Sequence, residues 1–145
     1  MPLAALPEIS NWSSANHSHE AVKAPHLLRG ANSEQAACKW LQTRGLVLVE
    51  KNYRCPYGEL DLIMLEETCL AIIEVRYRHN NHHGGALESV TVTKQRRLGR
   101  TAENFLRQTK VYSRHPLRFD VVAISGFEPE LQLDWRRNAF QFDDN

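Results

Sequence analysis

Two short acidic stretches within apolar segments carry the residues of this sequence best suited to chemistry. The first is Gly58-Glu59-Leu60-Asp61-Leu62-Ile63, and the second, Glu74-Val75-Arg76, begins thirteen residues after Asp61. A charged side chain in an apolar strand costs free energy unless a partner compensates for it. Two neighbouring strands that share an acidic face can form a binding site for a divalent cation. The pattern therefore indicates a metal site, and the expected chemistry is metal-assisted cleavage of a phosphodiester.

Strand periodicity decides which of these side chains can meet. Alternate residues of a strand point to the same face, so Glu74, Arg76 and Arg78 are expected to share one face that Asp61 can approach. Two carboxylates brought together repel each other, and a divalent cation such as Mg²⁺ would remove that penalty. The alternative is a cross-strand ion pair of Asp61 with Arg76 or Arg78, which needs no metal.

Two helical residues could reach the same point. Glu34 begins a stripe of apolar and small residues at helical spacing, so its side chain is expected to face the core. It would either reach toward the cation or one of its waters, or serve as a capping residue near the first turn. Lys94 stands beside the apolar stripe of a second predicted helix, where it would either contact a phosphate or remain solvated.

The elements that position these residues are expected in the order αβββαββ. We predict helices from Asn32 or Ser33 to about Arg44 and over 93–108, and strands over 46–54, 59–65, 69–78, 117–125 and 130–136. The first three strands should form a meander, and the second helix allows a crossover to a parallel fourth strand. Residues 1–28 are expected to be a flexible N-terminal tail, and residues 29–145 a single domain.

Composition places the chain among ordinary soluble proteins. It has 145 residues, of which 42% are hydrophobic and 24% charged. The three cysteines form no CxxC pair, which disfavours a disulfide framework or a structural zinc site and fits a reducing cytoplasm. No apolar run approaches the length of a membrane span, and the first residues do not resemble a signal peptide. We therefore expect a cytoplasmic protein without a membrane partner.

The net charge of +1 hides a strongly basic segment. Between Arg76 and Arg118 there are ten Lys or Arg residues and only two acids, which gives this segment a charge of +8. Such a block favours a polyanionic partner, and the alternative is a solvated basic helix surface. The residues expected to contact nucleic acid are Arg78, Lys94, Arg96, Arg97 and Arg100. DNA is the expected partner, and RNA stays open.

Other motifs are weaker. His79, His82 and His83 fall in a predicted polar loop, where solvated side chains are expected rather than a zinc site lacking further ligands. The sequence contains no GxSxG motif, no P-loop and no GxGxxG motif. Nucleophilic serine chemistry and the common nucleotide-binding loops therefore have no support.

The combination of motifs resembles a known family. A helical Glu34, then Gly58-Glu59-Leu60-Asp61-Leu62-Ile63, then Glu74-Val75-Arg76-Tyr77-Arg78, is similar to the YraN-type family of small bacterial proteins. The likeness continues through Gly85-Ala86, Lys94 and Arg118-Phe119-Asp120-Val121-Val122 to Asn138-Ala139-Phe140, and covers about residues 30–142. That family is similar to the PD-(D/E)XK nuclease superfamily, in particular to archaeal Holliday-junction resolvases.

This resemblance implies a restriction-endonuclease-like α/β core, a mixed central sheet flanked by helices, and phosphodiester hydrolysis with Mg²⁺ or Mn²⁺. By residue type, Asp61 takes the place of the motif's first Asp and Glu74 that of its second acid. Glu34 matches the helical Glu of the resolvase-like branch. Val75 would offer its carbonyl oxygen to the cation. Resolvases of this fold act as dimers, so a homodimer is compatible with the resemblance.

Arg76 departs from the motif, which has lysine at this position. Arginine stays protonated, with a pKa above about 12, so it cannot act as a general base, although it can orient water and stabilise negative charge. Three interpretations follow: activation of water by the cation alone suffices, Lys94 substitutes for the missing lysine, or the site binds without cutting. The first hypothesis is a metal-dependent endonuclease acting on structured or branched DNA. The alternatives are a non-catalytic nucleic-acid-binding module on the same fold and a protein-interaction adaptor.

Overall fold

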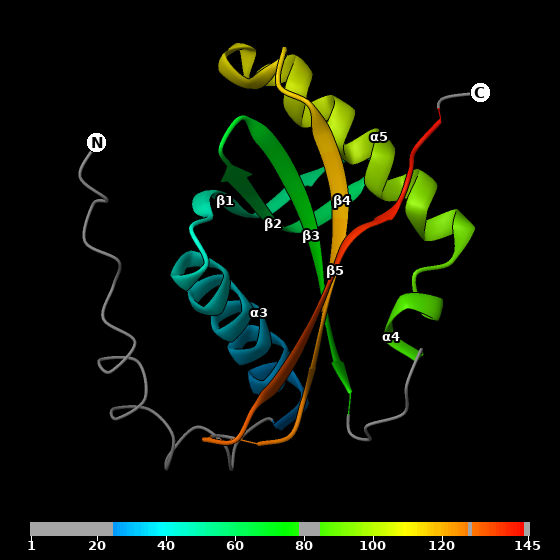
Figure 1. Cartoon of the computed structure of the whole chain (residues 1–145). Helices are drawn as coiled ribbons and strands as arrows, with labels where there is room; N and C mark the ends of the chain where they lie inside the picture. The colour runs from blue at the N-terminus through cyan, green and yellow to red at the C-terminus, as the bar shows by residue number, and fades with distance from the viewer. Residues whose placement is uncertain (1–24, 79–84, 128, 144–145) are drawn as a thin grey trace.

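The computed structural model describes residues 25–78, 85–127 and 129–143 of the chain. These ranges form one mixed five-stranded sheet with helices on both faces (Figure 1). In chain order the elements are α3 (Pro25–Thr43), β1 (Val47–Cys55), β2 (Gly58–Glu66), β3 (Cys69–Arg78), α4 (Gly85–Glu88), α5 (Val92–Gln108), the 3-10 helix η1 (Lys110–Tyr112), β4 (Leu117–Ser125) and β5 (Gln132–Phe140). None of the helices in these ranges is long and apolar enough to cross a membrane.

The strand topology confirms the predicted α/β order αβββαββ. The sheet order is β1-β2-β3-β4-β5, with antiparallel pairing of β1, β2 and β3 as the predicted meander. The β3–β4 pair is parallel, and the segment between these strands contains α4, α5 and η1. A parallel pair requires such a crossover because the chain must return to the same end of the sheet. β5 then pairs antiparallel with β4.

Two hydrophobic clusters lie on opposite faces of the sheet. Under α3, the helix residues Ala37, Cys38 and Leu41 pack with buried side chains of the central strands. Under α5, Leu98, Ala102 and Phe105 pack with the other face. Figure 1 shows the two helices on either side of the strands. The apolar stripes predicted for both helices therefore face the core, and the sheet is covered on both sides.

The first helix is longer than predicted. α3 begins at Pro25, and Asn32 and Ser33 lie inside it rather than at its start. Proline suits the first turn of a helix, because its ring fixes φ near the helical value and its missing N–H group has no helical partner there. The predicted tail over 1–28 overlaps the first four residues of α3, and residues 1–24 lie outside the described ranges. The second helix, the third strand and the fourth strand agree with prediction within one residue.

The pairing of β2 with β3 ends in the middle of the sheet, where the two strands separate. Their pairing runs from Glu66–Cys69 to Leu62–Ile73 and ends there, whereas β1 and β2 stay paired as far as Cys55–Gly58. Leu60 and Leu62 also lie in different core clusters, although residues two apart in a regular strand share a face. The alternation of β2 is therefore interrupted at Asp61, the residue between them.

A buried ionic cluster fastens β5 to β4. Asp120 is fully buried, and its carboxylate accepts hydrogen bonds from the Arg118 guanidinium, the Trp135 indole and the Asn138 backbone N–H. Arg118 also bonds Glu66, which in turn accepts from Arg137. The pKa of Glu66 is lowered, chiefly by its hydrogen bonds with Arg137 and then with Arg118. The Arg118-Phe119-Asp120 motif thus has a structural role in this fold.

Candidate functional site

Asp61 lies at the point where β2 leaves β3. Its Oδ2 atom accepts a hydrogen bond of 2.9 Å from the Val75 backbone N–H, so a side chain takes the place of a strand partner at this position. The neighbouring residue of β1, Asn52, has a left-handed φ of 52°, which locally distorts the paired strand. The interruption turns the Asp61 carboxylate toward the edge of β3 between the separating strands.

Glu74 approaches the same point from the face covered by α5. Its side chain is 7% exposed, and Oε1 lies 2.9 Å from the Lys94 ammonium nitrogen. The Arg76 Nε atom is 3.7 Å from the same oxygen, and the Arg76 guanidinium reaches the Ser89 carbonyl at 3.5 Å. Lys94 therefore points toward the sheet and pairs with Glu74, and its contact with a phosphate stays a prediction. Asp61 forms no ion pair with Arg76 or Arg78 among the interactions of residues 25–78, 85–127 and 129–143.

Glu34 reaches Asp61 from the opposite face, where α3 lies. Burial raises the pKa of Glu34, as does repulsion by Glu59 and Glu74, while hydrogen bonds with the Asp61 and Asn52 side chains lower it. Three carboxyl groups from α3, β2 and β3 therefore act on one another. Asn52 was not singled out from the sequence, because a lone Asn in a polar strand is a weak signal.

Crowding of these acids changes the ionisation of Asp61. Burial raises the pKa of Asp61 to about 8, assisted by repulsion from Glu74 and Glu34, while the Val75 N–H and Lys94 act in the opposite direction. In the absence of a further cation, the group of acids thus retains a proton near neutral pH. A bound divalent cation would supply the missing positive charge.

The oxygen donors at this point fit a magnesium-type ion only in part. No group of three or more His, Cys, Asp or Glu side chains in the described part of the chain is arranged to hold a metal ion by itself. Mg²⁺ commonly keeps several waters and takes only one or two protein carboxylates, so the Asp61–Glu74 pair is compatible with such an ion. His79, His82 and His83 lie outside the described ranges, so the prediction for that loop remains a prediction.

The predicted nucleic-acid contacts divide into two groups. Arg96, Arg97 and Arg100 are exposed on α5, on the solvent side of the helix. Lys94 and Arg78 are partly buried: Lys94 contacts Glu74, and the Arg78 guanidinium donates to the Gly85 carbonyl at the start of α4. The exposed arginines therefore form the accessible part of the basic segment, and Lys94 belongs to the acidic site instead.

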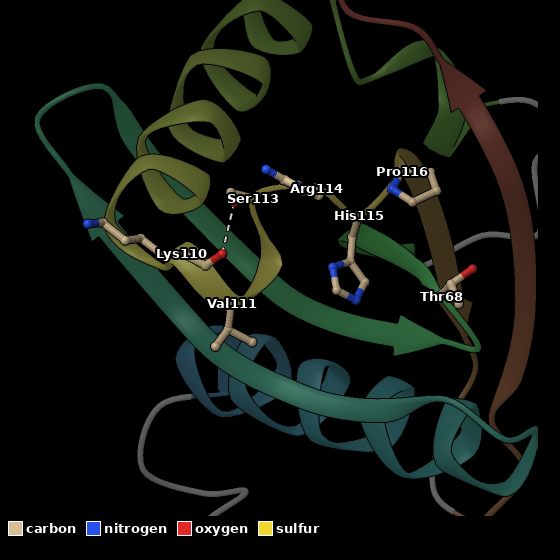
Figure 2. Close-up of a pocket in the computed structure, with 7 residues that line it drawn as sticks. All are labelled: Thr68, Lys110, Val111, Ser113, Arg114, His115 and Pro116. Atoms are coloured by element: carbon tan, nitrogen blue, oxygen red, sulfur yellow. Dashed lines mark hydrogen bonds between the residues drawn. The ribbon is translucent and has the colours of Figure 1, made fainter.

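A separate hollow lies at the far end of α5 (Figure 2). It has a volume of about 350 Å³ and lies at the β2–β3 turn and the start of β4, with Thr68, Ser113 and His115 among its lining residues. Figure 2 shows the His115 ring beside Val111, while the Lys110 side chain extends outward. Its lining, taken over the described residues, includes no carboxylate, and Leu70 rather than Glu74 pairs with the first residue of β4. This hollow is distinct from the acidic site.

Comparison with known proteins shows the relationship of the chain. Residues 33–124 match the model of the uncharacterised protein family UPF0102. A UPF0102 protein of Nitrosococcus oceani is 43% identical over 81% of this chain and 95% of its own length. A UPF0102 protein of Ectopseudomonas mendocina is 49% identical over 77% of this chain and 92% of its own length. The matched region contains Glu34, Asp61, Glu74 and Lys94, and the chain belongs to the UPF0102 family, the YraN-type family that its motifs resemble.

Proposed function

We propose that this protein is a metal-dependent endonuclease that hydrolyses phosphodiester bonds of DNA. The observation that carries the proposal is the meeting of Asp61, Glu74 and Lys94 at the gap between β2 and β3. Two carboxylates and an ammonium group that meet at one point form an arrangement suited to a cation, a phosphate and a water molecule. The resemblance to PD-(D/E)XK nucleases supports the same reaction.

Asp61 and Glu74 would hold the cation together with the Val75 carbonyl oxygen. The Val75 N–H points toward Asp61, and the N–H and C=O groups of a strand residue lie on the same edge. Pairing of β2 with β3 has already ended at Leu62–Ile73, so this edge of β3 faces the gap rather than a strand partner. All three groups would coordinate the cation through oxygen atoms, the ligand type that Mg²⁺ and Mn²⁺ prefer.

When bound, a divalent cation lowers the pKa of a coordinated water and polarises the phosphate. The residues of the chain then divide the remaining work. Lys94 can orient the attacking water and, unlike arginine, can lose a proton when its environment favours the neutral amine. Arg76 would stabilise negative charge on the phosphate oxygens, and Glu34 would hold a water or a proton beside Asp61.

The exposed arginines of α5 would bind the phosphate backbone of the nucleic acid. Arg96, Arg97 and Arg100 follow Lys94 on the same helix, so a phosphate backbone bound along their side chains leads to the acidic site. Contacts of this kind depend on salt and carry little sequence information. We therefore expect selection of the substrate by its structure rather than by its base sequence.

Cleavage of branched and linear DNA tests the proposal. Wild type is incubated with each DNA in Mg²⁺ or Mn²⁺, beside Glu74→Gln and the surface control Asp134→Asn. The proposal expects metal-dependent cleavage by wild type and by the control, and loss of about 10² or more in rate in Glu74→Gln. Cleavage that survives Glu74→Gln would remove this site from the reaction.

A second candidate function is nucleic-acid binding without cleavage. It is favoured by Arg76 at the lysine position and by the existing contact of Lys94 with Glu74, which already compensates that carboxylate. This candidate expects salt-dependent DNA or RNA binding that tolerates Asp61→Ala and requires the arginines of α5. Binding without metal-dependent cleavage, unchanged in Asp61→Ala, would favour it over the nuclease.

A further inference from the structure

The turn between β1 and β2 carries an exposed aromatic side chain near the acidic site. Pairing of Cys55 with Gly58 closes a turn formed by Pro56 and Tyr57. The proline ring fixes its own φ, which limits the conformations of the turn. Tyr57 is 46% exposed. Because aromatic rings release much free energy when they are buried, a ring left exposed at this level is available to a ligand.

Tyr57 is not part of the hydrophobic core of the described residues. It lies outside both core clusters, and within the described residues its hydroxyl group has no hydrogen bond and its ring no aromatic partner. Tyr53 on the same hairpin differs: its ring lies 5.2 Å from that of Phe105, and its hydroxyl group donates to Asn104 at 2.5 Å. Tyr53 thus holds the hairpin to α5, whereas Tyr57 is half exposed.

The hairpin end is fixed against the basic helix. A Cβ atom added at Gly58 would lie 3.1 Å from both the Arg97 Cγ and the Thr101 Oγ1 atoms, so the strand and α5 are in close contact there. This contact and the Tyr53–Asn104 hydrogen bond hold the turn at one place on the helix. Tyr57 is therefore presented by a supported element, beside the exposed Arg97.

Two arginines lie near the turn that carries Tyr57. Arg54, with a side chain 76% exposed, precedes the turn and contacts Glu59 at 3.4 Å, and Arg97 follows on α5. Aromatic rings beside arginines are the combination by which proteins bind single-stranded nucleic acid, with bases stacked on the rings and phosphates held by the cations. The chemistry of this surface matches an unpaired base attached to a phosphate backbone.

We propose that Tyr57 stacks on an unpaired base of DNA beside the bond to be cut. The inference rests on the proposed nuclease function and names its substrate class. Tyr57 precedes Asp61 by four residues, which places their Cα atoms at most about 13 Å apart at about 3.3 Å per strand residue. Bases inside a duplex are stacked on one another and cannot reach such a ring. The favoured substrate is therefore DNA with an unpaired arm at the cleavage point, such as a fork or flap.

Binding to a forked DNA tests the role of Tyr57. The fork carries 2-aminopurine in its unpaired arm, and affinity is measured in EDTA for this fork and for a blunt duplex of equal length. Wild type is compared with Tyr57→Ala, Tyr57→Phe and Tyr57→Leu. The matched control is Phe127→Ala, which removes an aromatic that is 62% exposed on the β4–β5 connection. Cleavage of the same fork in Mn²⁺ is recorded as a separate readout.

The expected result is a loss of about five- to 100-fold in fork affinity in Tyr57→Ala, with duplex affinity unchanged. Tyr57→Phe should retain both the affinity and the quenching of 2-aminopurine, Tyr57→Leu should lose the quenching, and the Phe127 variant should match wild type. Equal fork affinity in Tyr57→Ala and wild type, or equal losses for fork and duplex, would overturn the role of Tyr57 without contradicting the proposed nuclease function.

Binding that depends on Tyr57 but is not followed by cleavage would overturn the proposed nuclease function instead. Wild type that binds no DNA would overturn both proposals.

Discussion

The Lys94 ammonium nitrogen lies 2.9 Å from a Glu74 carboxylate oxygen, although the two residues belong to α5 and β3. A lysine therefore enters the acidic site from the helix, while the strand position expected to hold it is occupied by Arg76. The Arg76 Nε atom is buried without a hydrogen bond in the described structure and lies 3.7 Å from the same oxygen. The two cations flank Glu74 from different elements, and an arginine guanidinium cannot act as a general base.

This geometry predicts unequal effects of removing the two cations. Lys94→Ala should lower the rate of DNA cleavage by about 10² to 10⁴, the range typical of a group that transfers or positions a proton. Arg76→Ala should cost less, because its guanidinium can only stabilise charge. Single-turnover cleavage at saturating enzyme measures both. A larger loss in Arg76→Ala than in Lys94→Ala would reverse the assignment.

The raised pKa of Asp61 predicts how stability depends on pH. Folded protein holds a proton on Asp61 up to about pH 8, whereas the ordinary pKa of an Asp carboxyl is 3.8. Stability from this group is thus present in full below about pH 4 and is lost as the pH rises through about 8. Asp61→Asn cannot ionise, so in EDTA its melting temperature relative to wild type should rise as the pH rises from about 4 to about 8, and the difference should change little above that.

The exposed carboxylate of Asp134 provides the matched control for this measurement. Its side chain is 59% exposed and pairs with Arg136 on the surface of β5, so Asp134→Asn should follow the wild-type pH curve. Parallel curves for wild type and Asp61→Asn would show that Asp61 is ionised throughout, and would contradict the crowding of the three acids.

The fold was largely predictable because its signals are local. Apolar alternation identified the strands, and the bounds of β3 and β4 followed from it. The start of α3 was missed because Ser33 is a good capping residue in isolation, and tertiary packing buried it inside a longer helix instead. Strand β5 continues to Phe140, beyond the predicted end at Arg136, because Phe140 packs on Phe119 and Asn138 bonds Asp120.

The sequence indicated which residues form the candidate site, but not which of them contact one another. Residue phase identified Glu34 and Glu74 as acids turned toward the sheet, but it assumed a regular strand at Asp61, where the alternation is interrupted. The preference of Glu74 for Lys94 depends on how α5 crosses the sheet, and the bond from Val75 to Asp61 depends on where β2 leaves β3. Both are properties of the assembled fold, so periodicity alone could not supply them.

The exposed face of α5 predicts a salt-dependent, sequence-independent affinity. Arg96→Ala and Arg100→Ala each remove one cation that would neutralise a phosphate, and each should reduce the slope of log K against log salt by about 0.9 for duplex DNA. The reduction should be equal for DNAs of unrelated sequence. Arg136→Ala removes an exposed arginine from β5 and serves as the control. Slopes that are the same in all three variants and wild type would place the DNA elsewhere on the molecule.

The buried carboxylate of Asp120 predicts a large effect on stability. Asp120→Ala leaves Arg118, the Trp135 indole and the Asn138 N–H without their acceptor, and should lower the free energy of unfolding by about 3–5 kcal/mol. Urea unfolding measures it, with Asp134→Ala expected to cost under about 1 kcal/mol. Equal losses in the two variants would show that the buried cluster contributes no more than a surface pair.

Binding of Mn²⁺ tests the central claim most directly, because it does not depend on the choice of DNA. Calorimetric titration of metal-free protein at about pH 8, close to the pKa of Asp61, should show one ion bound to wild type and to Asp134→Asn. Asp61→Asn and Glu74→Gln should each abolish this binding or weaken it by more than about tenfold. Wild type that binds no Mn²⁺, or binding that is unchanged in both variants, would contradict a cation site between β2 and β3.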